Sequence, residues 1–143
     1  MLQRSLLLAC SLYSAALVAQ PGILDPTFGV GGKAVAPMAG TYCSGEAIAE
    51  QADGKIIVVG ATPGNAMLAR FTVAGSLDPT FGTGGIVLTD VDASNDFVGC
   101  VAVQPVGRIL AGGVRFDATA SGKAIVMRYT SNGAFGTYNR GFK

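Results

Sequence analysis

A nine-residue phrase occurs twice in the chain and constrains its fold more than any other feature. Leu24-Asp-Pro-Thr-Phe-Gly-Val-Gly-Gly32 returns 53 residues later as Leu77-Asp-Pro-Thr-Phe-Gly-Thr-Gly-Gly85. We call these phrases the first and the second signature. Residues 51–60 (QADGKIIVVG) match residues 104–113 (QPVGRILAGG) at the same offset. A period of this size indicates one supersecondary unit used repeatedly, which buries its apolar face by stacking on its neighbours.

The first nineteen residues have the layout of a secretory signal peptide. Arg4 is their only charge, residues 5–18 are uncharged and mostly apolar, and small residues precede Gln20. A membrane-spanning helix would need about 20 apolar residues, so we expect residues 1–19 to be removed. The cut would follow Ala19 or Ala16. The sequence therefore predicts a secreted or cell-envelope protein whose mature chain, residues 20–143, does not insert into the membrane.

Charge and residue content exclude several classes of function. From Gln20 onward the chain has nine basic and nine acidic residues, so we expect no nucleic-acid partner, because such a partner needs a basic patch. Histidine is absent, which removes a Ser–His or Cys–His nucleophile. We predict that the protein is not an enzyme. A hydrolase or lyase that acts on polysaccharide through carboxylates alone remains an alternative, since two such groups suffice for glycoside hydrolysis.

The apolar pattern predicts four short strands in each repeat and no helix after the signal segment. Asp53-Gly54 between apolar runs is typical of a tight hairpin. Residues 56–59 are continuously apolar, so we expect that strand to be covered on both faces. We predict an all-β fold of tandem four-stranded antiparallel blades, a partial β-propeller-like array. The expected strands are residues 33–36, 46–51, 55–59 and 66–73, then 86–89, 98–104, 108–111 and 123–130.

The repeated phrases resemble the delta-60 repeat of bacterial secreted, β-propeller-like proteins. The resemblance is carried by Leu-Asp-Pro-Thr-Phe-Gly-x-Gly-Gly, Gln-x-Asp-Gly-Lys-Ile-Ile-Val-Val-Gly and Ala-Arg-Phe-x-x-x-Gly-Ser-Leu-Asp, and covers residues 23–143. It divides the chain into one repeat at about residues 24–76, a second at about 77–134, and a degenerate third start at 135–143. There Tyr138 takes the place of Phe81. The resemblance implies an architecture and an extracytoplasmic setting, and no established activity.

Three matched pairs of residues recur with the repeat and invite interpretation. We expect the two signature aspartates to form Asx-turns, the two phenylalanines to be wedges between blades, and the two mid-strand arginines to need buried partners. Those partners would be a signature aspartate or backbone carbonyls. A carboxylate pair at a site, and a ligand bound by the arginines near a central channel, are the alternatives. The pairs are Asp25 with Asp78, Phe28 with Phe81, and Arg70 with Arg128.

One cluster has the spacing of metal ligands. Asp90, Asp92, Ser94 and Asp96 stand at positions 1, 3, 5 and 7 of a calcium-loop pattern. The pattern is incomplete, because position 6 is not glycine and position 12 is Val101. We expect no cofactor and keep calcium as an alternative.

Two cysteines remain after the signal segment. Cys43 and Cys100 do not occupy equivalent repeat positions, so the repeat gives no reason to pair them. We expect two small buried hydrophobic side chains, with a disulfide as the alternative in a secreted protein.

The leading functional hypothesis is a non-enzymatic extracytoplasmic scaffold or binding module. Loops on a rigid frame usually carry recognition, so residues 90–96 and 114–122 are the expected contact loops. The ligand would be an unidentified protein or glycan. Copies of the chain closing a propeller together, and a truncated fragment of a longer repeat protein without independent function, are further alternatives.

Overall fold

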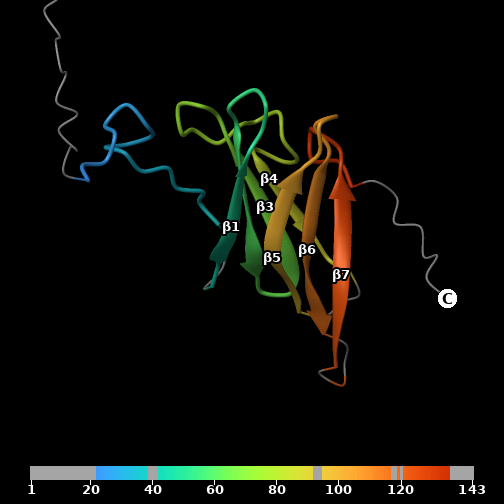
Figure 1. Ribbon diagram of the computed structural model, residues 1–143. Coiled ribbons are helices and arrows are strands. Elements are labelled where there is room, and N and C mark those ends of the chain that lie inside the picture. The colour runs from blue at the N-terminus through green and yellow to red at the C-terminus, as the bar shows by residue number, and fades with distance from the viewer. Residues whose placement is uncertain (1–21, 39–41, 92–94, 117–118, 120, 136–143) are drawn as a thin grey trace, which may run out of the picture.

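The computed structural model describes residues 22–38, 42–91, 95–116, 119 and 121–135. Every regular element among them is a strand, which confirms the all-β prediction, and no helix long and apolar enough to cross a membrane occurs in these ranges. The strands form two antiparallel sheets, of order β1-β2-β3-β4 and β5-β6-β7 (Figure 1). Their bounds are β1 Ser44–Glu50, β2 Ile56–Thr62, β3 Asn65–Phe71, β4 Ile86–Thr89, β5 Asp96–Val103, β6 Ile109–Phe116 and β7 Gly122–Tyr129.

The hairpins follow the turn chemistry of the sequence. Between β1 and β2, Gly54 adopts a φ of 78° and its amide donates to the carbonyl of Gln51, so the Asp-Gly hairpin is confirmed. The β6–β7 hairpin differs from the expected loop at residues 114–122. There β6 continues to Phe116, which pairs with Gly122, so both strands extend into residues that were predicted to form the loop.

The sheets and the sequence repeats are out of phase, which corrects the expected strand grouping. Residues 86–89 were predicted as the first strand of the second repeat. As β4, they instead pair with β3 of the first repeat, with Ala66 opposite Thr89 and Ala69 opposite Ile86. The cause is the second signature, which turns the chain back alongside β3. A strand from one repeat therefore completes the sheet of the repeat before it.

The same phase explains why residues 33–36 are not the strand that was predicted. They would pair with the strand of a preceding repeat that is equivalent to β3, and no strand of the described residues precedes Ser44. Instead, Ala34, Ala36 and Met38 pack against the outer face of the first sheet, over Met67 and Phe71.

The core lies between the two sheets. Ile57, Val59 and Leu68 from the first sheet are fully buried against side chains of the second, including Ile109 and Tyr129. The opposite face of β2 packs against the cluster that residues 34–38 cover, so burial of this strand on both faces is confirmed. Burying one such aliphatic side chain stabilises the fold by about 1.5–3 kcal/mol.

The cysteine prediction was wrong. Cys43 and Cys100 are both exposed and neither forms a disulfide. Cys43 immediately precedes β1, and Cys100 lies on β5, the first strand of the second sheet.

Candidate functional site

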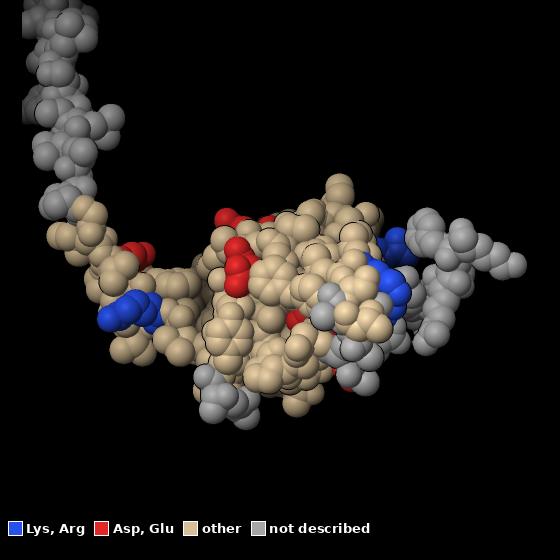
Figure 2. All heavy atoms as spheres, turned by 90° about the horizontal axis from the view of Figure 1, so that it is seen from below, with Lys and Arg blue, Asp and Glu red and all other residues tan. Residues whose placement is uncertain are grey.

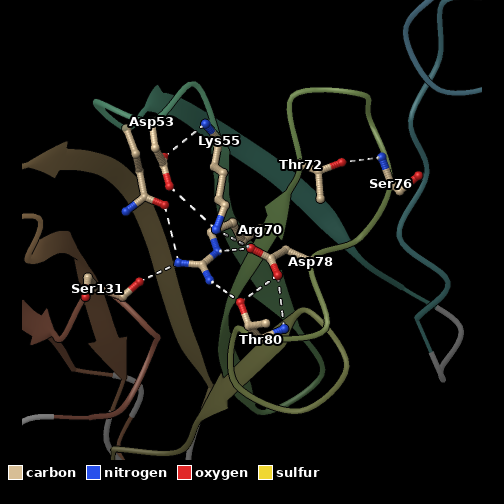
Figure 3. A network of polar contacts seen from close by, with 9 residues as sticks. Asp53, Lys55, Arg70, Thr72, Ser76, Asp78, Thr80 and Ser131 are labelled. Atoms are coloured by element: carbon tan, nitrogen blue, oxygen red, sulfur yellow. Dashed lines mark hydrogen bonds and ion pairs between the residues drawn. The ribbon is translucent and has the colours of Figure 1, made fainter.

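A buried ionic network surrounds Arg70, the last residue but one of β3. Its Nε lies 2.9 Å from Oδ2 of Asp78, and the Nζ of Lys55 lies 3.1 Å from the same oxygen (Figure 3). The side chains of Arg70 and Asp78 are only 6% and 5% exposed. Neither Arg70 Nε nor Asp78 Oδ2 makes a hydrogen bond within the described structure, so their contact is an ion pair. One buried carboxylate is thus paired with two cations.

The rest of the guanidinium connects the two repeats. Nη1 donates to the backbone carbonyl of Ser131 and, at 3.5 Å, to Oε1 of Gln51. Nη2 donates to the hydroxyl of Thr80 at 3.0 Å. The ring of Phe81, which is fully buried between the sheets, has its centroid 4.6 Å from the Arg70 Cζ, within cation–π range. Each of the three guanidinium nitrogens therefore has a protein partner, and the partners come from both repeats.

The second signature begins with an Asx-turn that fixes Asp78. The Thr80 amide and hydroxyl both donate to Asp78 Oδ1, at 3.0 and 2.7 Å. The hydroxyl bond is the largest cause holding the pKa of Asp78 far below its ordinary value of 3.8; the amide, Lys55 and Arg70 also lower it, and burial opposes them. Asp78 is therefore ionised at neutral pH.

The first signature has the same turn without the cations. The Thr27 amide and hydroxyl donate to Asp25 Oδ1 at 2.9 and 2.6 Å, and the hydroxyl bond is the main cause of a lowered pKa. Asp25 is exposed and Phe28 is half-buried, unlike their counterparts in the second signature. Within the described ranges no lysine or arginine forms an ion pair with Asp25.

The second repeat carries the cations of the network without its carboxylate. Gln104, Arg108 and Arg128 stand where the first repeat has Gln51, Lys55 and Arg70. Arg128 is exposed, against the expectation of a buried arginine, and lines a shallow pocket of about 140 Å³ with Arg108. The structure does not bring a carboxylate of the described residues to it. Gly136, at the position of Asp78, lies outside the described residues.

Two residues of the calcium-loop pattern, Asp90 and Asp96, lie within the described residues. Asp96 is 2% exposed, and its Oδ2 accepts the amide of Val91 at 2.6 Å, while Oδ1 has no hydrogen bond to any described residue. Burial is the main cause of a raised pKa for Asp96, and the nearby charge of Asp90 adds to it. Asp92 and Ser94 lie outside the described residues. No group of three or more His, Cys, Asp or Glu side chains in the described ranges is placed to hold a metal ion.

Sequence reasoning overlooked four members of the network: Gln51, Lys55, Thr80 and Ser131. A signal for three of them was present. Gln51 and Lys55 recur as Gln104 and Arg108, and Thr80 recurs as Thr27, so a search for polar residues that keep the repeat offset would have found them. Ser131 acts through its backbone carbonyl, for which a sequence carries no signal.

Comparison with known proteins supports the architecture and names no activity. A family model described as a domain of unknown function (DUF5122) beta-propeller matches residues 51–81, the segment that contains Lys55, Arg70 and Asp78. No match was found among curated proteins or among solved structures. The match agrees with two stacked antiparallel sheets, which do not form a closed propeller.

Proposed function

We propose that the chain is a non-enzymatic, extracytoplasmic β-repeat scaffold of the delta-60 type, which binds a protein or a glycan without a resident metal ion. The observation that carries the proposal is the network around Arg70. Arg70 and Asp78 are buried, Lys55 is partly buried, and all three are paired with protein atoms that come from both repeats. Such a network holds repeats together and leaves no group directed at a substrate.

The chemistry of the buried carboxylates supports a structural role. General acid–base catalysis works best when the pKa of the catalytic group lies near the working pH. The pKa of Asp78 is moved far in the other direction, and its carboxylate is already paired with two cations. Asp96 has a raised pKa and is the acid best suited to an alternative role as a hydrolase acid.

The surface supports binding to a large partner. Figure 2 shows a face with few charged side chains, most of them toward its margins. Exposed aliphatic side chains occur on several strands and turns, among them Ile48, Val73, Val106 and Val126. Apolar surface of this kind, where it is contiguous, usually marks a site of interaction with another macromolecule.

Export is part of the proposal and has a direct measurement. The protein recovered from outside the cytoplasm should have an intact mass that lacks residues 1–19 or 1–16. A mass that includes residue 1 would contradict the proposed export by a cleaved signal segment.

The absence of enzyme activity is tested with the exported protein on a panel of neutral and acidic polysaccharides. We expect no release of reducing ends or unsaturated products, and we expect any bound glycan to raise the melting temperature by mass action. Asp96→Asn is the matched control, because it removes the one described acid whose raised pKa suits general acid chemistry. Product release that is lost in Asp96→Asn would overturn the scaffold proposal in favour of a hydrolase or lyase.

A further inference from the structure

Each end of the described structure carries one unmatched half of the contact that joins the two repeats. We propose that a second copy of this chain docks head-to-tail, with Asp25 of one copy paired to Arg128 and Arg108 of the next. Residues 33–36 of the first copy would add a strand along β7 of the second. This inference deepens the proposed scaffold function and rests on it, because it names the partner that the repeats are built to stack upon.

The head consists of residues 24–36, and its first nine residues, the first signature, already have the conformation of the signature that docks within the chain. The amide of Gly32 donates to the carbonyl of Phe28 at 2.9 Å, and that of Gly85 donates to Phe81 at the same distance. The Asx-turns of Asp25 and Asp78 match as well. The amide of Gly29 donates to the carbonyl of Ala74 in the turn after β3. In the same way, the amide of Gly82 donates to the carbonyl of Asn132 in the turn after β7. The first signature therefore needs no refolding before it binds, and residues 33–36 would become a strand when they pair with β7.

The tail consists of Gln104, Arg108, Arg128 and the edge of β7 with which no described strand pairs. In the first repeat, the amide of Arg70 donates to Gly85 and its carbonyl accepts from Asp78, both at 2.9 Å. None of the described residues bonds the backbone of Arg128 in this way. The Oε1 of Gln104 is buried without a hydrogen bond in the described structure, whereas that of Gln51 accepts from Arg70. The tail thus presents two cations, a backbone edge and an orphaned acceptor.

The outer apolar faces of the two sheets also lack the neighbouring sheet that each would have inside a longer array. Leu68 on β3 is fully buried against the second sheet, whereas its counterpart Val126 on β7 is 66% exposed. At the other end, the outer face of the first sheet is covered by residues 34–38, which lie where the last strand of a preceding sheet would lie. If the β5-β6-β7 sheet of another copy lay beside residues 33–36, its β7 would pair with these residues. Its Val126 would then be covered by the copy that supplies them.

Charge favours a second copy over the chain's own last residues as the occupant. Residues 136–143 contain no aspartate or glutamate side chain and two basic ones, Arg140 and Lys143. They cannot supply the aspartate that Arg128 and Arg108 lack, whereas Asp25 is an exposed carboxylate in the matching turn. The first signature and β7 lie toward opposite ends of the molecule, and Figure 2 shows basic side chains at the β7 end (Figures 1 and 2).

The contact is heterologous, so it produces a closed ring or an open filament. Closed propellers have about 4–8 blades. With two blades in each copy, a ring would contain about two to four copies.

The test is the mass of the purified protein in solution, measured by light scattering behind a sizing column, with its N-terminus defined by intact mass. We expect the wild type to form oligomers, and Asp25→Ala and Arg128→Ala to be monomers when each is alone. An equimolar mixture of the two variants should form a 1:1 pair, because one intact head then meets one intact tail. A wild type that stays monomeric at the highest soluble concentration, or variants that assemble like the wild type, would overturn the proposal.

A second variant tests the strand contact separately from the charges. The amide of Arg70 points away from β2, so the amide of Leu68, two residues earlier, does too. Because Val126 is the counterpart of Leu68 in the second repeat, its amide faces the edge of β7 that points away from β6. Proline is tolerated at such an edge position. Val126→Pro should abolish assembly and keep a cooperative melting transition; assembly that persists would contradict strand addition. A monomeric wild type without polysaccharide cleavage would refute this inference alone, whereas cleavage would refute the proposed function alone.

Discussion

Replacing Asp78 by asparagine separates the charge of the network from its shape. Asparagine is nearly isosteric, and its side-chain oxygen can still accept the two Thr80 bonds of the Asx-turn. What disappears is the negative charge that lies 2.9 Å from Arg70 and 3.1 Å from Lys55. The substitution therefore measures the electrostatic contribution of the carboxylate.

The expected loss follows from the burial of the two charges. Removing one partner of a buried ion pair costs about 3–5 kcal/mol, because the other charge remains buried and uncompensated. The guanidinium of Arg70 keeps its bonds to Ser131 and Thr80, and Lys55 is 30% exposed with Asp53 only 3.5 Å away. We therefore expect the low end, about 3 kcal/mol, which is a large part of the 5–15 kcal/mol that typically stabilises a domain.

Urea unfolding of the wild type, Asp78→Asn and Asp25→Asn measures this effect. With a slope of about 2 kcal/mol per molar, the Asp78→Asn midpoint should fall by about 1.5 M. Asp25→Asn is the matched control, since Asp25 occupies the same turn in an exposed position without a cation; at protein concentrations where the wild type is monomeric, its midpoint should not move. Equal midpoints for Asp78→Asn and the wild type, or equal shifts in the two variants, would refute the reasoning.

The pH dependence provides an independent check on the same pair of proteins. The pKa of Asp78 is lower in the folded state than its ordinary value of 3.8. A carboxyl group of this kind stabilises the fold above its unfolded pKa, and this stabilisation is lost as the pH falls toward the folded pKa. The difference between the wild type and Asp78→Asn should be constant from pH 7 to about pH 5 and shrink below about pH 4.

Two further predictions concern the packing between the repeats. Gly133→Ala should destabilise the fold by at least about 2 kcal/mol in chemical denaturation, because its φ is +84° and a Cβ would lie 2.8 Å from the buried Phe81 ring. Gly84→Ala, at φ +62° with open space around it, should cost only about 1 kcal/mol, and equal losses would contradict the packing argument. Burial raises the pKa of Tyr129 to about 12, against the Thr89 bond that lowers it, so unfolding ionises this group above pH 10. Raising the pH from 9.5 to 11 should cost the wild type roughly 1 kcal/mol more than Tyr129→Phe, and identical pH profiles would contradict it.

The fold class was predictable because it depends on patterns that a sequence carries directly. Strand periodicity, the Asp53-Gly54 turn and the Asp-Pro-Thr turns are local, and all appear in the structure. The phase of the sheets was not predictable in the same way. A repeat has the same period wherever its boundary is placed, so the sequence alone does not say whether residues 86–89 belong to the sheet before or after them. That choice is made by tertiary contacts between the second signature and β3.

The two arginines show the same limit at the level of single residues. Arg70 and Arg128 have similar local sequences, Leu-Ala-Arg-Phe and Val-Met-Arg-Tyr, and the pattern predicted buried positions for both. Their burial differs because the signature that follows Arg70 contains Asp78, whereas the position equivalent to Asp78 after Arg128 is Gly136. The signal that separates them therefore lies in the next repeat, eight residues beyond each arginine, and not in the strand itself.

This dependence on the next repeat changes what a stable unit of the chain is. In many repeat proteins each unit is folded and meets its neighbours only at an interface. Here the first sheet takes its fourth strand, its buried carboxylate and the Phe81 wedge from beyond residue 76, so residues 24–76 alone lack all three. The second sheet, by the same rule, takes its completing strand and carboxylate from whatever follows or docks beyond β7. The Arg70 network is thus better understood as the junction between successive repeats than as a property of either one.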